Sequence, residues 1–150
     1  MRATLLVLIL LAGCGSPGPP APLPLEQLPS ERAKLLTIPD EYKVRSNPLP
    51  ASEANLLEGR ARYQEYCAVC HGPDGKGNTV LGRGLYPPAG DLTSPKAQIY
   101  TDGQLFWMVS EGVRFSGMPA GRAMHSEEQM WKIVLYLRQF RRHAVDTVAG

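Results

Sequence analysis

The side chains best suited to chemistry lie together in the pentapeptide at residues 67–71. Cys67 and Cys70 are three positions apart, and His71 follows directly. On a helix, residues three apart lie on the same face, so each of these thiols can add to a vinyl group of one haem. The next residue then offers an imidazole nitrogen to the iron. The spacing C-x-x-C-H is typical of c-type haem attachment, and it predicts a single covalent haem c.

Two other kinds of site use closely spaced cysteines. A zinc site needs four ligands, which usually include a second cysteine pair, whereas Cys14 is the one cysteine outside the motif. A thioredoxin-like redox pair needs a strand before it and an α/β pattern around it. Here a helical pattern precedes the motif and no series of strands follows. Both alternatives are disfavoured.

The N-terminus has the pattern of an export signal. A positive start is followed by an apolar run over residues 3–12, which is too short for the ~20 residues of a membrane-spanning helix. The run ends in Leu-Ala-Gly-Cys at residues 11–14, which resembles the lipobox of bacterial lipoproteins. This resemblance implies that residues 1–13 are removed and that Cys14 takes a diacylglycerol, which would anchor the chain to a membrane. Export also suits c-type haem attachment, which takes place outside the cytoplasm.

Proline dominates the segment that follows. Residues 15–50 hold nine of the 14 prolines, and the proline-rich stretch over residues 17–24 cannot form a helix or a central strand. We expect residues 14–50 to be a lipidated cysteine and a semi-rigid tether, extending ~3.1 Å per residue. Residues 38–42 could dock on a neighbouring subunit, although a solvated linker is the preferred interpretation. The 16 Lys and Arg against 14 Asp and Glu form no basic patch, which argues against nucleic-acid binding.

Three helices are predicted beyond the tether. The first begins after Ser52 and runs into the cysteine motif, with Leu56, Gly59 and Tyr63 on one face.

The other two helices have capping boxes. One begins at Thr101, with Gln104 at the third helical position, and Gly112 can end it in a left-handed conformation. The last begins at Ser126, with Gln129 at the third helical position, and ends near residue 142 among basic side chains that suit the helix dipole.

Residues 53–142 resemble the class I c-type cytochromes, the small monohaem family. The resemblance implies an all-α cytochrome c fold, with three main helices and long loops wrapped around the haem. A haem would explain residues 72–100, which show no helix or strand pattern and form an unusually long loop for a compact domain. In the family, a glycine of the first helix lets an aromatic residue of the last approach, and Gly59 and Tyr136 match these positions. We expect a haem domain over residues 51–142 and a disordered tail over 143–150.

The second axial ligand of the iron has several candidates: Met108, Met118, Met124, Met130, His125 and His143. Residues 116–120 read Ser-Gly-Met-Pro-Ala and resemble the G-M-P segment that carries the axial methionine in this family. Met118 is therefore the preferred ligand, and Met124 is the runner-up. Met108 and Met130 lie within helical patterns, where methionine is usually core filler.

On the His71 side of the haem, the family usually supplies a proline carbonyl that accepts the other ring N–H. Here Ala-Gly-Asp-Leu occupies residues 89–92, so Gly90 stands where proline is common. The carbonyl survives this departure, but the rigidity does not. Pro87 or Pro88 could compensate, and the choice between these acceptors stays open.

An iron held by His71 and Met118 has no open position, and Met/His ligation raises the reduction potential. The resemblance thus implies an electron-transfer protein, not an enzyme, working between redox donor and acceptor proteins. A peroxidase or gas sensor would need an open position and a polar group beside it, for which His125 is the visible candidate. A non-redox structural lipoprotein is disfavoured by the cysteine motif.

The lipid anchor and tether also resemble monohaem subunits of quinol-oxidising membrane complexes, including alternative complex III. We expect the protein at the bacterial cell envelope, with its haem domain in the periplasm or outside the cytoplasmic membrane.

Overall fold

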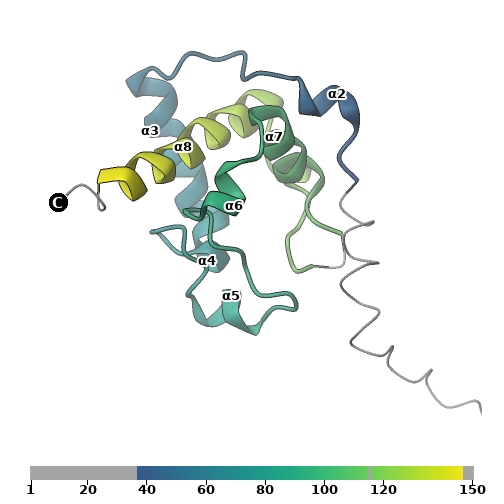
Figure 1. Cartoon of the computed structure of the whole chain (residues 1–150), viewed down its shortest axis with the longest axis vertical. Coiled ribbons are helices and arrows are strands. Elements are labelled where there is room, and N and C mark those ends of the chain that lie inside the picture. The colour runs from purple at the N-terminus through teal and green to yellow at the C-terminus, as the bar shows by residue number, and fades with distance from the viewer. Residues whose placement is uncertain (1–36, 115, 147–150) are drawn as a thin grey trace, which may run out of the picture.

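The structure, a computed structural model, describes residues 37–114 and 116–146. Residues 1–13, Cys14 and most of the expected tether lie outside this part of the chain. Within it there is no strand, and its helices are α2 (Asp40–Lys43), α3 (Glu53–Arg62), the π-helical η2 (Tyr63–Cys67), α4 (Ala68–His71), α5 (Val80–Gly84), α6 (Pro95–Gln98), α7 (Asp102–Glu111), the 3-10 turn η3 (Gly121–Ala123) and α8 (Glu127–Asp146). The predicted all-α fold is confirmed (Figure 1). None of the helices in these ranges has the length and apolar character needed to cross a membrane.

A close crossing of α3 and α8 organises the domain (Figure 1). A Cβ atom added to Gly59 would lie 2.0 Å from the carbonyl oxygen of Lys132 and 3.3 Å from Cβ of Tyr136. The predicted glycine–aromatic approach is therefore present, although the tightest contact is with a backbone carbonyl one turn before Tyr136. The Lys132 ammonium pairs with Glu58 across the crossing at 2.8 Å.

The fully buried Tyr63 joins this crossing to the cysteine motif. Its ring packs against those of Tyr136 and Phe140, with centroids 5.2 and 5.3 Å away, and these two rings also contact each other. Its hydroxyl donates a hydrogen bond to the carbonyl of Gly72, 2.6 Å away, immediately after the motif. The core of α8 thereby fixes where the motif helix ends.

The predicted caps of α7 and α8 are both present. The Thr101 hydroxyl accepts from the N–H of Gln104, whose side chain accepts from the N–H of Thr101. Ser126 and Gln129 exchange the same pair of hydrogen bonds. Gly112 ends α7 with a positive φ of 71°, as predicted, but its ψ of −171° differs from that of the left-handed helical conformation.

Two stretches without predicted helix are partly helical. The loop over residues 72–100 contains α5, which is capped by Thr79. It also contains α6, which is capped by Ser94 and has Pro95 at its first helical position. Such short helices depend on their caps for stability. The sequence did not predict them, because four or five residues are too few to show a hydrophobic period. The tail expected to be disordered from residue 143 is also corrected, since α8 continues to Asp146. Residues 147–150 lie outside the described ranges.

The end of the expected tether packs on the domain. Residues 37–50, here named the N-terminal strap, include α2 and the buried Ile38. The guanidinium of Arg45 lies 5.1 Å from the centre of the Phe106 ring and 5.0 Å from that of Trp131. The side chain of Asn47 donates to the Trp131 carbonyl at 2.9 Å. The expectation of a solvated linker is therefore wrong for this part of residues 14–50.

The crossing at Gly59 generates a stability prediction. Alanine normally stabilises a helix relative to glycine by ~1 kcal/mol, but at Gly59 its methyl group would meet the Lys132 carbonyl. We expect Gly59→Ala to lower the free energy of unfolding by ~1–3 kcal/mol, measured by denaturant unfolding. Gly84→Ala is the matched control, because nothing lies within 4 Å of a Cβ there. Equal stability of the two variants would contradict the close crossing.

Candidate haem site

The cysteine motif lies on one continuous helical run that extends from α3 through η2 and α4. Cys67 ends the π-helical turn, while Cys70 and His71 lie on the following α-helical turn. A π turn widens the helix and is frequent at functional sites; nothing in the sequence pattern indicated it. Gly72, with a φ of 77°, ends the run directly after His71.

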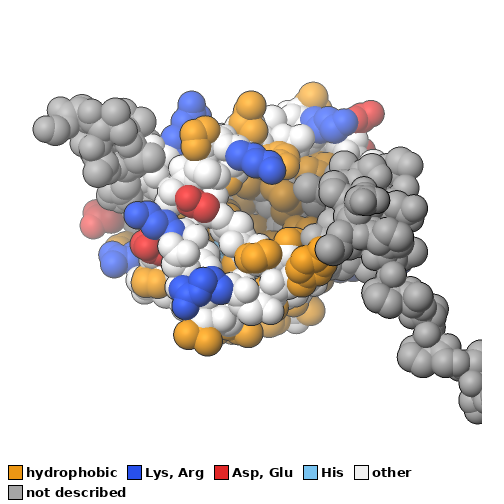
Figure 2. Space-filling view, turned by 60° about the horizontal axis from the view of Figure 1, so that its bottom comes forward, with side chains coloured by type: hydrophobic (Ala, Val, Ile, Leu, Met, Phe, Trp, Pro, Cys, Tyr) orange, Lys and Arg blue, Asp and Glu red, His pale blue; other side chains and the backbone are white. Residues whose placement is uncertain are grey.

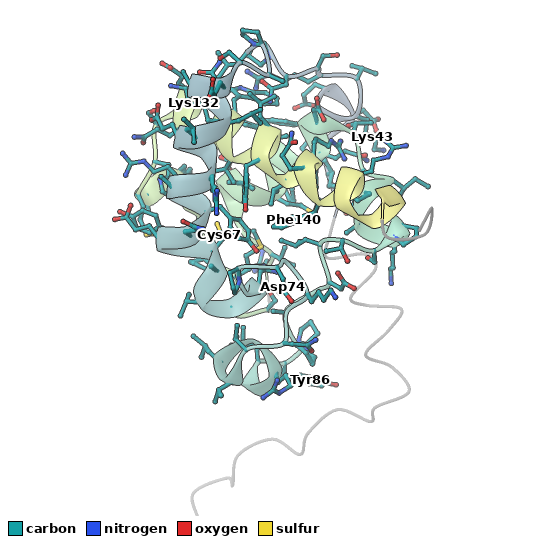
Figure 3. The ribbon with its side chains drawn as sticks, turned by 90° about the vertical axis from the view of Figure 1, so that its left-hand side faces the viewer. Lys43, Cys67, Asp74, Tyr86, Lys132 and Phe140 are labelled. Carbon is teal, nitrogen blue, oxygen red and sulfur yellow. The ribbon has the colours of Figure 1, made fainter. Side chains whose placement is uncertain are left out.

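Both motif cysteines are free thiols and half-buried. Figure 3 shows Cys67 in the interior, near Phe140 of α8, and Tyr86 at the far end of the molecule. Burial, together with the neighbouring Cys70 sulfur, raises the pKa of Cys67 to about 11. The Cys67 side chain is therefore a neutral thiol at neutral pH in this structure.

His71 is oriented by a backbone carbonyl. Its Nδ1 lies 3.0 Å from the carbonyl oxygen of Gly90, so Gly90 is the acceptor, where the sequence left Gly90, Pro87 and Pro88 open. Burial lowers the pKa of His71, so the neutral ring donates through Nδ1–H and leaves the Nε2 lone pair free. This is the tautomer that a histidine ligand to a metal adopts, with its other nitrogen held by a hydrogen bond.

The Gly90 carbonyl is held from both sides along the chain. The N–H of Ala89 donates to the Gly82 carbonyl at 2.9 Å, and the N–H of Leu92 donates to the Gly75 carbonyl at 2.7 Å. These two bonds fix the segment without the proline that is common at position 90.

The Met118 segment folds back on the end of α7. The carbonyl of Met118 accepts from the N–H of Val113 at 3.2 Å, and its N–H donates to the Ser116 hydroxyl at 3.1 Å. A Cβ at Gly112 would lie 2.6 Å from the Met118 carbonyl. Met118 is half-buried, and its backbone is fixed on the connection between α7 and η3.

The loop on the His71 side and the Met118 segment meet each other. A Cβ at Gly117 would lie 2.5 Å from the side chain of Leu85, which follows α5. When the region of α4 and α5 is turned toward the viewer, Figure 2 shows a hollow with hydrophobic side chains gathered in it. This region of the molecule thus has a hydrophobic hollow, and the elements around it carry a free imidazole nitrogen on His71 and two free thiols, which together fit a bound haem.

The other ligand candidates differ in their surroundings. Met130 is buried in the hydrophobic core and Met108 packs against that core. Both therefore have the core-filling role predicted from the sequence. Met124 is 47% exposed. His125 is buried, its ring edge meets Tyr66 with centroids 4.5 Å apart, and its Nδ1 has no hydrogen-bond partner in the described ranges. Burial and the nearby Arg62 lower the pKa of His125, so this ring is neutral.

The comparisons with known proteins now identify the family. Residues 54–137 match the family described as "Cytochrome C oxidase, cbb3-type, subunit III", and this stretch is more than half of the chain. The chain belongs to this family. Its domain is accordingly a c-type cytochrome, which contains haem and transfers electrons.

Two more distant similarities agree with this assignment. A thiosulfate dehydrogenase from Stutzerimonas stutzeri is 28% identical over 98 residues, which are 63% of this chain and 30% of that protein. The c-type cytochrome thus spans less than a third of this relative. A chain of the Kuenenia stuttgartiensis reducing HAO-like protein complex has the same fold, with a TM-score of 0.56 at 21% identity over 62% of this chain and 46% of that one.

The support of the Gly90 carbonyl can be tested at Gly77, which sequence reasoning missed. Gly77 has a φ of 72°, and a Cβ there would lie 2.3 Å from the Ala89 carbonyl. We expect Gly77→Ala to displace the segment that orients His71 and to destabilise the haem-loaded protein by ~1–3 kcal/mol. Thermal unfolding followed at the haem absorption measures this. Asn78→Ala is the control, because Asn78 is exposed and directly follows Gly77. Equal midpoints of thermal unfolding for the two variants would refute the expectation.

Proposed function

We propose that this c-type cytochrome carries single electrons through one haem attached to Cys67 and Cys70, with His71 and Met118 as the axial ligands. The observation that carries the proposal is the orientation of His71, whose Nδ1–H is bonded to Gly90 while Nε2 stays free. The contact of Leu85 with Gly117 supports it, because it brings the Met118 segment against the loop on the His71 side.

The bound haem would supply a reversible one-electron change at its iron. The chain's own contribution is to keep the surroundings unchanged during that step. His71 is held by the Gly90 carbonyl, and the Met118 backbone is held by Val113 and Ser116. Ligands held in this way in both oxidation states favour rapid outer-sphere transfer, and a thioether ligand favours a raised potential.

A catalytic role is the second candidate. It is favoured by the relative named thiosulfate dehydrogenase and by His125, a buried neutral imidazole whose Nδ1 lacks a partner in the described ranges. Catalysis at the iron needs an open coordination position, whereas a carrier needs both positions filled. The state of the sixth position therefore separates the two functions.

We expect Met118→Ala to open that position. The ferrous variant should bind carbon monoxide, its potential should fall, and some peroxidase activity should appear, since the thioether that favours ferrous iron is lost. Met124→Ala is the matched control, because Met124 is 47% exposed on the same connection. It should keep the wild-type spectrum and potential. In each protein, the pigment should stay with the polypeptide on extraction with acidified organic solvent.

The reverse behaviour of the two variants would make Met124 the ligand. Carbon monoxide binding by the wild type equal to that of Met118→Ala would mean an open iron, and the catalytic role would then replace the carrier.

The location proposed is a membrane surface at the bacterial cell envelope, with the haem domain in the periplasm or outside the cytoplasmic membrane and a lipid on Cys14. Because the N-terminal strap packs on the domain, the tether would be residues 15–36 and would reach at most ~70 Å at polyproline-like extension. Such a reach suits redox partners at the same membrane, and a monohaem subunit of a quinol-oxidising complex such as alternative complex III would have this arrangement.

Cys14→Ser tests the anchor. An alcohol does not replace the thiol in lipidation, so the variant should lose or alter its membrane association, as membrane fractionation and detergent partitioning would show. The haem spectrum of the released protein should be unchanged, because the strap and the haem domain are intact. Processing and membrane retention like those of the wild type would show that another element holds the protein.

A further inference from the structure

The buried Gln98 links the loop that orients His71 to α8. Its side-chain nitrogen donates to the Leu92 carbonyl at 2.7 Å and to the Leu137 carbonyl at 3.1 Å. Leu92 lies two residues after Gly90, whereas Leu137 belongs to the core helix α8. The side-chain amide of Gln98 therefore connects the loop to α8. It bonds the loop two residues after Gly90, whose carbonyl accepts from His71.

Arg138 fixes Gln98 in turn. Its guanidinium donates to the backbone carbonyl of Gln98 at 3.3 Å and to the side-chain oxygen at 3.4 Å. It also donates to the Tyr100 carbonyl at 2.6 Å and pairs with Asp102 at 2.8 Å. The Gln98 amide consequently has its oxygen toward Arg138 and its nitrogen toward the two carbonyls, so its orientation is determined.

This network answers a specific weakness of the sequence. Gly90 lacks the fixed φ that a proline would supply at that position. Its own N–H makes no hydrogen bond in the described part of the chain. The backbone bonds of Ala89 and Leu92 hold the segment to neighbouring loops. The Leu92 side chain packs against the hydrophobic core, and Gln98 adds a hydrogen-bonded link from the Leu92 backbone to α8.

We infer that Gln98 is a positioning residue for His71, acting through Leu92 and the Gly90 carbonyl. The inference rests on the proposed ligation by His71 and extends it. Loss of the Gln98 tie should let the Gly90 carbonyl move away from the ring nitrogen. The imidazole would then be a weaker donor to the iron, since a hydrogen bond at the other ring nitrogen raises ligand basicity.

The test compares holoproteins of the wild type, Gln98→Met and Asn47→Ala. Gln98→Met keeps the length of the side chain but removes the donor. We expect its reduction potential to rise, and the His71 Nδ1–H in the ferrous protein to exchange with solvent about five- to tenfold faster by NMR, the factor for losing one hydrogen bond. Asn47→Ala loses stability where the N-terminal strap meets the domain, because the side chain of Asn47 donates to the Trp131 carbonyl, and it should change neither quantity.

A rescue variant makes the inference sharper. A Cβ at Gly90 meets nothing within 4 Å, and its φ is outside the left-handed region. Adding Gly90→Pro to Gln98→Met should therefore restore both the potential and the slow exchange. If Gln98→Met does not yield loaded protein, Gln98→Glu replaces it, because the carboxylate keeps the pairing with Arg138 and still removes the donor. The exchange rate is then the readout, because the added negative charge lowers the potential by itself.

A Gln98 variant could lose stability and still keep the reduction potential and the His71 Nδ1–H exchange rate of the wild type. That result would overturn the inference, and the role of Gln98 would then be purely structural. Failure of the proposed ligation would appear differently. In that event the His71 ring signals of the wild type would lack the shift caused by a bound haem, whatever the Gln98 variants do.

Discussion

The rest of the structure depends on the contact of two helix backbones at Gly59. Without a side chain there, α3 approaches the Lys132 carbonyl of α8 closely enough for Tyr63 to be buried between the two helices. Tyr63 then reaches the Gly72 carbonyl with its hydroxyl. A packing constraint far along the helix thus sets the position of the last residue of the motif, His71, because Gly72 is its direct neighbour.

The half of the domain that surrounds the haem site is organised differently. Apart from two short helices, it consists of loops, and their backbones are held by individual hydrogen bonds rather than by a regular core. Glycines allow the close approaches: Gly77 lies under Ala89, Gly82 lies against the Cys70 carbonyl, and Gly117 lies against Leu85. A side chain at any of these positions would collide with the neighbouring segment and push the two loops apart. This arrangement suits a domain in which a large apolar cofactor completes the core.

The sequence was sufficient wherever a local rule determines the structure. The motif at residues 67–71, the caps at Thr101 and Ser126 and the termination at Gly112 follow from residue type and spacing alone. The acceptor of the His71 ring could not be chosen in this way, because Pro87, Pro88 and Gly90 offer similar carbonyls. The choice of Gly90 depends on hydrogen bonds from distant segments, and no local pattern records such bonds.

The N-terminal strap is a second case in which local sequence does not predict long-range contacts. Its proline content correctly excludes a long helix, but that composition says nothing about what the chain lies against. Arg45 is held by the aromatic faces of Phe106 and Trp131, whose rings are stacked with centroids 4.1 Å apart, and by a salt bridge to Glu127.

Tyr42 adds a further ring, stacked on Phe106 at 6.3 Å, and a Cβ at Gly103 would lie 2.1 Å from the Tyr42 carbonyl. The start of α7 is therefore shaped to receive the strap, and removing the strap would expose ring faces that the three-helix core does not cover. The folding unit accordingly begins before residue 51, near Ile38. The tether that we propose could therefore lie only N-terminal to that point, and the strap determines where on the domain it would attach.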